Sequence, residues 1–153
     1  MKQSGICISK CNDNHKHGIV TLTEQTNGNI KIKVYIEGIS PGLHGFHVHR
    51  SGNVKCGATS LCDHYNPTFQ VHGDLNSPRS HAGDLGNIKA NKNGIVDIEI
   101  ISKRMQLDDI FGRSLVVHED PDDLGLGKYK DSLTTGHSGK RILWGIIARD
   151  EKC

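Results

Sequence analysis

The stretch that decides the fold class is residues 29–38, NIKIKVYIEG. Apolar side chains occupy every second position, and Lys31, Lys33, Tyr35 and Glu37 fill the positions between them. Because side chains of a β-strand point alternately to two faces, this pattern predicts a strand with one buried face and one exposed face. Weaker versions of the pattern occur at 18–25 and 94–102, and the segments 113–119 and 141–150 also read as strands.

The segments between the predicted strands favour an all-β protein. Asn-Gly pairs at 27–28 and 93–94 are the strongest short signals for β-hairpins, and the chain contains 18 glycines. Convincing helical periodicity is absent. Two polar segments, about 50–87 and 119–141, are longer than ordinary connections, and loops of that length in a compact domain are usually functional. The sequence therefore predicts one domain over 1–153, an antiparallel β-sandwich or barrel with two long loops.

Composition argues against two classes of partner. Lys and Arg total 19 and Asp and Glu 17, which gives a net charge of +2, and the basic residues are scattered. Aromatic residues are only 5% of the chain, so neither a basic patch nor a base-stacking platform for nucleic acid is expected. No apolar run approaches the roughly 20 residues of a membrane span. The first residues also lack the apolar run of a signal peptide, so we expect a cytosolic protein.

Histidine is abundant, with 10 residues, and seven positions form a pattern typical of metal sites. His64, His72, His81 and Asp84 follow one another at spacings of eight, nine and three, and three imidazoles with a carboxylate make a closed tetrahedral set for zinc. His47, His49 and His118 lie in strand-like segments. An imidazole-rich set suits copper, although ligand type alone also admits zinc or nickel.

The remaining histidines are interpreted more simply. His15, His17 and His137 are expected on the surface in polar turns, and His44 is expected to brace the backbone of a loop rather than bind metal. Asp122 is suited to accept hydrogen bonds from ligand histidines. The alternative for Asp122 is a solvated acidic turn.

Five motifs together resemble copper/zinc superoxide dismutase, in the same order and with matching separations. They are GLHGFHVH at 42–49, DHYNP at 63–67, HAGDLGNI at 81–88, SLVVHEDPDDLG at 114–125 and TGHSGKR at 135–141. The resemblance runs from about Gly5 to Ala148. It implies a Greek-key β-sandwich or flattened barrel of about eight strands, and an enzyme that converts two superoxide anions and two protons into dioxygen and hydrogen peroxide.

The resemblance also implies a role for particular residues. Each subunit would hold one copper and one zinc, with His64 as the bridging imidazolate and as a proton donor to peroxide. Arg141 would attract superoxide, and Thr135 would narrow the entrance. Lys128, Lys130 and Lys140 are candidates for steering the anion, and the alternative for these lysines is ordinary solubility. Asp122 would link the outer nitrogens of two ligand histidines, His47 and His72. The copper ligands would be His47, His49, His64 and His118, and the zinc ligands His64, His72, His81 and Asp84.

The sequence departs from the family pattern at the disulfide. The family joins a cysteine in the loop after HVH to one just past the active-site arginine, where this chain has Trp144. Cys56 and Cys62 flank the first position, and neither has its usual partner. An odd total of five cysteines leaves at least one thiol free, and in a reducing cytosol all five are expected to be free. Packing of Trp144 could fill the space of the missing bridge.

Further expectations concern assembly and copper loading. The resemblance implies a homodimer, although Ser51 and Arg149 stand where apolar residues are expected. Lys140 and Ile142 replace the prolines found near the arginine in chaperone-dependent members, which suggests loading without a copper chaperone. The alternatives are a catalytically impaired metal-binding or chaperone relative, a structural zinc protein, and a β-sandwich binding module with surface histidines. The expected apolar dimer patch is Gly52, Ile110, Phe111, Gly112 and Ile146.

Overall fold

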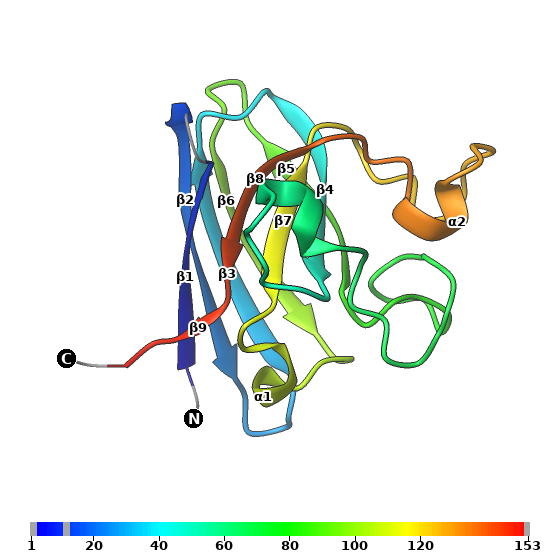
Figure 1. Ribbon diagram of the computed structural model, residues 1–153, viewed down its shortest axis with the longest axis horizontal. Helices are drawn as coiled ribbons and strands as arrows, with labels where there is room; N and C mark the ends of the chain where they lie inside the picture. The colour runs from blue at the N-terminus through cyan, green and yellow to red at the C-terminus, as the bar shows by residue number, and fades with distance from the viewer. Residues whose placement is uncertain (1–2, 11–12, 152–153) are drawn as a thin grey trace.

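A computed structural model describes residues 3–10 and 13–151 and forms two antiparallel sheets, which face each other in Figure 1. The expectation of an all-β sandwich is confirmed. The first sheet has the order β6 (Val96–Ser102), β3 (Ile30–Glu37), β2 (Asp13–Glu24), β1 (Gln3–Lys10) and β9 (Ala148–Arg149). The second sheet has the order β5 (Asp84–Ala90), β4 (Gly42–His49), β7 (Ser114–His118) and β8 (Arg141–Ile146).

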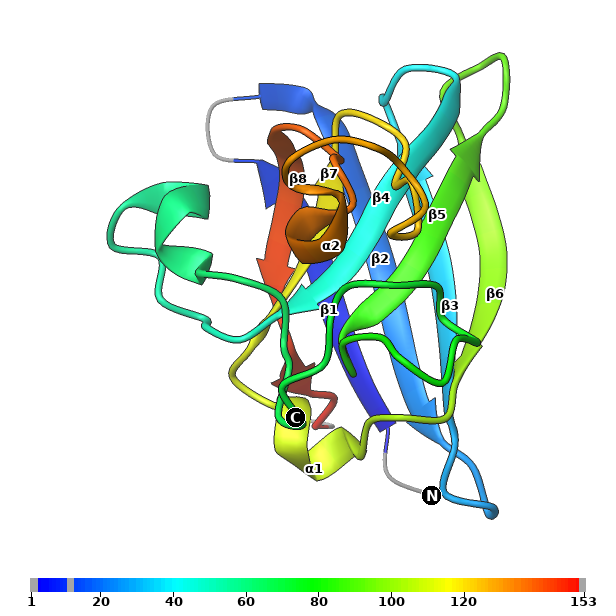
Figure 2. The same cartoon turned by 90° about the vertical axis from the view of Figure 1, so that its right-hand side faces the viewer.

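Helices are short in the described part of the chain. They are the 3-10 helix η1 (Gly57–Leu61), α1 (Leu107–Ile110) and α2 (Ser132–Thr135). None of them has the length and apolar character needed to span a membrane. The helices η1 and α2 interrupt the two long loops, so they contribute to the surface beside the second sheet rather than to the core (Figure 2).

The core lies between the sheets and follows the alternation seen in the sequence. The apolar residues of 30–36 are almost completely buried, and β3 lies between β2 and β6 in the first sheet. Val34 is opposite Val20 on one side and Ile98 on the other. From the second sheet, Phe46 and Val48 of β4 point into the same core. The alternation in β3 therefore sets which face of the central strand is buried.

The two Asn-Gly turns have different roles. Residues 25–29 join β2 to β3 as a hairpin, with the backbone N–H of Gln25 donating to the carbonyl of Asn29 over 2.8 Å. The second turn, at 91–94, does not make a hairpin within one sheet. It joins β5 of the second sheet to β6 of the first, because β6 takes β3 as its ladder partner. This turn thus lies at an edge of the sandwich where the chain changes sheets.

The two long loops cover the same outer region of the second sheet. They follow β4 and β7, which are neighbours in that sheet, and span 50–83 and 119–140. The prediction that the first loop extends to 87 was wrong, because residues 84–87 already pair with β4 as part of β5. His47 and His49 point away from the core yet are at most 1% exposed, so the loops bury the outer face of β4.

Candidate metal centre

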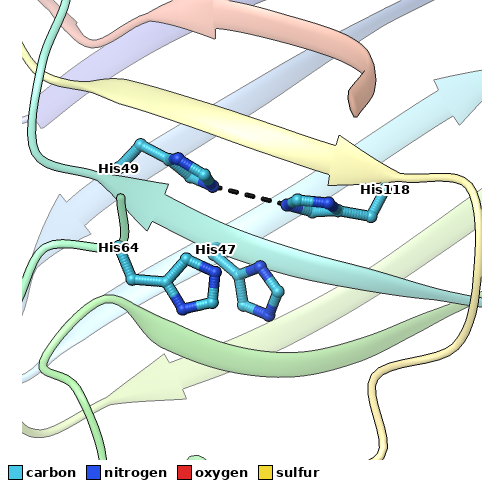
Figure 3. A group of neighbouring side chains, drawn as sticks. All are labelled: His47, His49, His64 and His118. Carbon is cyan, nitrogen blue, oxygen red and sulfur yellow. Dashed lines mark hydrogen bonds between the residues drawn. The ribbon is translucent and has the colours of Figure 1, made fainter. Parts of the chain in front are cut away.

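Four histidines from three parts of the chain converge on the outer face of the second sheet. His47 and His49 lie on β4, His118 ends β7, and His64 lies in the 50–83 loop, where it forms an isolated bridge with His49. Figure 3 shows their rings around one small region. One ring nitrogen from each lies within 4.8 Å of the others, and all four residues are buried. The structure therefore brings together the set that the resemblance assigned to copper.

Strand pairing is irregular next to two of these histidines. The β4–β5 register shifts between Gly45 and His47, and the β7–β8 register shifts between Val117 and His118. Such irregularities bend a strand locally and turn its side chains, and they are frequent beside functional sites. Both shifts fall directly before a histidine of the cluster.

Hydrogen bonds fix the tautomers of His49 and His118. Nδ1 of His49 donates to the carbonyl of Cys62 over 2.7 Å, and Nδ1 of His118 donates to the carbonyl of Gly139 over 3.1 Å. Each neutral ring then carries a lone pair on Nε2. The two Nε2 atoms lie 3.3 Å apart (dashed line in Figure 3), so two acceptors face each other. A cation near both nitrogens satisfies this arrangement, whereas two neutral rings of this tautomer cannot satisfy each other.

A second cluster surrounds the carboxylate of Asp84. Its Oδ1 lies 2.9 Å from Nδ1 of His64, 3.0 Å from Nδ1 of His72 and 3.3 Å from Nδ1 of His81. The other oxygen, Oδ2, accepts the backbone N–H groups of Gly73 and His81 over 3.1 and 2.9 Å. The backbone thus holds the carboxylate while three imidazole nitrogens gather on its free oxygen. These are the four residues that the sequence spacing assigned to zinc.

His64 belongs to both clusters. Its Nδ1 faces Asp84, and its Nε2 is buried with no hydrogen-bond partner. The ring of His64 stacks on that of His47, with centroids 3.9 Å apart, so His47 also lies near the second cluster. In the described part of the chain, Nδ1 of His47 is likewise buried without a hydrogen bond. Unsatisfied buried nitrogens are costly, and a bound metal removes that cost, so the donor set fits metal ions.

Asp122 connects the two clusters through hydrogen bonds to one histidine of each. Its two carboxylate oxygens accept hydrogen bonds from Nε2 of His47 and Nε2 of His72, each over 2.7 Å. Asn87 holds Asp122 in place, because its amide both donates to the Asp122 carbonyl and accepts from the Asp122 N–H. A side chain at Gly136 would overlap the Asp122 carboxylate, so the loop needs glycine there. Asp122 therefore fixes which nitrogen of each ring, Nδ1, remains free to bind metal.

The electrostatics favour neutral imidazoles in the first cluster, and an ionised carboxylate beside a protonated His72 in the second. Burial lowers the pKa of His47 and His49 well below the ordinary value and lowers that of His118 to about 3. Burial opposes ionisation of Asp84, but hydrogen bonds from three histidines hold its pKa well below the usual range. Burial also opposes the charge on His72, but hydrogen bonds to Asp122 and Asp84 raise its pKa to about 9. Neutral imidazole is the form that ligates metal.

Arg141 is held beside the first cluster by backbone carbonyls. Its Nη1 donates to the carbonyl of Ala58 and its Nη2 to that of Cys62, both over 2.6 Å. The carbonyl of Cys62 also accepts Nδ1 of His49, so one peptide group positions both side chains. Cys56 and Cys62 are free thiols, as expected, and Trp144 lies opposite Val116 in the β7–β8 ladder. Arg141 thus keeps a fixed position without the usual disulfide.

A cleft of about 850 Å³ leads to the centre between the two long loops. His64, His81 and Thr135 are among the residues that line it. Lys130 is exposed on the loop before α2 and is not part of the lining. The Thr135 hydroxyl is bonded to Asp131, which orients this side chain within α2.

The other sequence interpretations have mixed outcomes. His44 braces the backbone, as predicted: its Nδ1 and Nε2 each lie 2.8 Å from a carbonyl oxygen, those of His118 and Ser40. His15 and His17 are exposed, but they lie on β2 and not in a turn. His137 is exposed directly after α2. Sequence reasoning missed Asn87 and the two carbonyls that bind Arg141. Asn87 lies within the HAGDLGNI motif, whereas carbonyl groups leave no trace in residue types.

Comparison with known proteins gives a consistent result. Residues 16–147 match the family described as copper/zinc superoxide dismutase (SODC). "Superoxide dismutase [Cu-Zn] 3" of Arabidopsis thaliana is 44% identical over 138 residues, which cover 88% of this chain and 84% of that protein. The solved structure described as "Crystal Structure Analysis of the clock protein EA4" is similar with a TM-score of 0.92 and 32% identity. That similarity covers 97% of this chain and 94% of the solved one.

Proposed function

The chain belongs to the copper/zinc superoxide dismutase family, and from this premise we propose which of its residues carry the reaction. The protein is an enzyme that disproportionates superoxide to dioxygen and hydrogen peroxide, with copper and zinc as cofactors. Its full set of ligand-type residues and Arg141 disfavours an impaired, purely metal-binding relative, in which such positions would be lost.

We assign one metal to each cluster. Copper would be held by Nδ1 of His47 and by Nε2 of His49, His64 and His118. Zinc would be held by Nδ1 of His64, His72 and His81 and by Oδ1 of Asp84. The observation that carries this assignment is the set of buried nitrogens with unused lone pairs, above all the facing Nε2 atoms of His49 and His118. Copper accepts an imidazole-only set, and a carboxylate with three imidazoles suits zinc.

Bound copper would supply the one-electron redox chemistry, and the protein side chains would do the rest. The Arg141 guanidinium stays cationic at neutral pH and would attract and orient the superoxide anion. Thr135 would limit the entrance to small species. Nε2 of His64 is buried without a hydrogen-bond partner. When it does not hold copper, it would carry a proton and donate it to the nascent peroxide. This step suits an imidazole that is bonded on its other side to Asp84.

A matched pair of variants tests the assignment. His118→Gln removes a ligand from the copper cluster alone, and His81→Gln removes one from the zinc cluster alone. Removing a hydrogen-bond partner of a metal ligand weakens metal binding about 10- to 100-fold. Removing the ligand itself should therefore lower the affinity for the metal of that cluster by at least the same factor. Metal analysis after dialysis against a weak chelator should find zinc retained in His118→Gln and copper retained in His81→Gln. Loss of the same metal from both variants would contradict the assignment.

We also infer one domain over residues 1–153, with a Greek-key connection pattern and assembly into a homodimer. The single core cluster supports one domain, and the non-consecutive neighbours β3–β6 and β4–β7 support the Greek key. The expectation that Ile110 belongs to the dimer patch was wrong, because its side chain is fully buried in the core of the single chain. Phe111 of the patch is partly exposed, and the Arg149 guanidinium lies 4.1 Å from the centroid of its ring. Sedimentation equilibrium should give twice the chain mass at micromolar concentration. A monomer at that concentration would contradict the dimer.

We further propose that the protein acts in the cytosol and acquires copper without a dedicated chaperone. The free thiols of Cys56 and Cys62 suit a reducing compartment, and Arg141 has hydrogen bonds that need no disulfide to form. Protein expressed in a cell that lacks the copper chaperone should contain copper and be active. Recovery of copper-free protein from that cell, with copper present in its chaperone-containing parent, would overturn the proposal.

A further inference from the structure

The cleft beside the metal centre is larger and chemically richer than a diatomic anion needs. Its volume, about 850 Å³, is in the range of pockets that hold small organic ligands. Its lining includes His64 and Thr135, residues of the 50–83 loop, and the two arginines Arg50 and Arg113. In Figure 1 this loop, in green, and α2, in orange, lie on the same side of the molecule. The cleft is therefore lined at Arg50 and Arg113 by residues that are not candidate metal ligands, and we call this part its far end.

The far end of the cleft is basic. Arg113 is fixed there: its Nη1 donates to the carbonyl of Arg50 over 2.6 Å, its Nε donates to the carbonyl of Asp109 over 2.7 Å, and its guanidinium lies 4.3 Å from the centroid of the Tyr65 ring. Arg50 adds a second guanidinium on an exposed side chain. Among the lining residues, Asp63 is the one carboxylate, so two arginines outweigh it by one positive charge.

The walls nearer the entrance are apolar and exposed. Phe69 is 91% exposed, and Leu133 of α2 and Val71 also show about half of their surface to solvent. Phe69 has φ of 53°, which is uncommon for a bulky residue. The Asn66 side chain stabilises this turn, because its amide donates to the carbonyl of Gln70 over 2.8 Å and accepts the N–H of Gln70 over 3.0 Å. The loop thus holds an aromatic ring in solvent beside the cleft.

We propose that this cleft binds small amphipathic carboxylates, with the carboxylate at Arg50 and Arg113 and the hydrocarbon tail along Phe69, Val71 and Leu133. Guanidinium groups pair well with carboxylates, and exposed apolar side chains gain from covering an alkyl chain. A superoxide anion can interact with the arginines but has no hydrocarbon part to contact the apolar side chains. A ligand in this position lies across the approach to His64 and Thr135, so it would slow superoxide disproportionation. That inhibition rests on the proposed function, whereas binding itself does not.

Titration calorimetry with the copper- and zinc-loaded protein tests binding directly. The probes are butanoate, hexanoate, octanoate and decanoate below their micelle concentrations, together with 1-octanol. Each added methylene should lower the dissociation constant roughly two- to fourfold. The upper limit, about fourfold, corresponds to complete burial of the methylene. The alcohol, without charge, should bind about tenfold more weakly than octanoate. Arg50→Gln should weaken octanoate binding about five- to tenfold, and Phe69→Ser should flatten the dependence on chain length.

Two control variants lie outside the cleft. Leu126→Ser removes an apolar side chain that is 83% exposed on the 119–140 loop, and Lys92→Gln removes a positive charge from the β5–β6 turn. Both should bind octanoate as the unaltered protein does.

Four results would overturn the proposal: affinity independent of chain length, equal binding by Arg50→Gln, binding only to anionic lipid vesicles, or sensitivity to Arg141→Gln alone. The last would indicate a carboxylate at the metal instead. An unchanged rate of superoxide disproportionation with octanoate bound would overturn the predicted inhibition but not the binding site.

Discussion

Replacement of Arg141 by Gln is expected to lower the rate of superoxide disproportionation about 10- to 100-fold at low ionic strength. The guanidinium shares the carbonyl of Cys62 with His49, a proposed copper ligand, and a fixed positive charge near a reactive centre raises the encounter rate of an anion by a factor in that range. The same variant should lose most of the decrease in rate that added salt causes, because screening acts on the charge that is removed. Stopped-flow or pulsed measurements between about 10 and 300 mM salt give both quantities.

Two further variants separate the charge of Arg141 from its position. Arg141→Lys keeps the charge but cannot make both bonds to the carbonyls of Ala58 and Cys62, so its rate should be intermediate. Lys92→Gln makes the same change in net charge far from the centre and should leave the rate within about twofold. A rate for Arg141→Gln equal to that of Lys92→Gln, with full copper and zinc content, would show that Arg141 has no special role.

Asp122→Asn is expected to weaken binding of both metals about 10- to 100-fold. The two carboxylate oxygens each accept a hydrogen bond from a histidine Nε2 over 2.7 Å, one from His47 and one from His72. An amide can accept only one of these bonds, and its NH₂ group faces the other N–H. One ring must then turn or change tautomer, which moves its free nitrogen away from the metal. Because each ring belongs to a different cluster, both sites should respond.

Metal affinities of this variant can be measured by competition with chelators of known strength. Asp120→Asn is the matched control, since it removes an exposed carboxylate two residues away on the same loop. It should bind both metals as the unaltered protein does. Unchanged affinities in Asp122→Asn would mean that the bridge seen between His47 and His72 does not orient them for metal binding.

Local pattern was sufficient to predict most of the strands. The alternation at 30–36 predicted the buried face of β3, because a strand with one face in a core has few other ways to bury its apolar residues. The pairing of strands depends on the whole chain. The Asn-Gly turn at 91–94 predicted a hairpin, yet β6 takes β3 as its partner and so leaves the sheet of β5. A turn motif specifies a reversal of the chain but not the sheet to which the next strand belongs.

The candidate site was predictable to a similar degree. The spacing of His64, His72, His81 and Asp84 indicated one cluster, since residues of a single loop can reach a common ion. The grouping of His47 and His49 with His118 needed the family resemblance, because spacing cannot show that β4 and β7 are neighbours. Two further features depend on backbone geometry, which residue types do not encode. They are the tautomers of the histidines and the positions of the carbonyls that accept hydrogen bonds from Arg141. The basic and apolar walls of the cleft combine residues of both long loops with Arg113, which precedes β7, so they too appear only in the folded chain.

The most direct measurement of the central claim is superoxide decay after pulse radiolysis, with protein that contains one copper and one zinc per chain. The account predicts a rate constant near the diffusional ceiling of about 10⁹ M⁻¹s⁻¹, for which superoxide dismutase is itself a standard example. It also predicts that this rate falls as ionic strength rises, because Arg141 attracts the anion across solvent. Decay no faster than in buffer alone, with both metals verified in the protein, would contradict it.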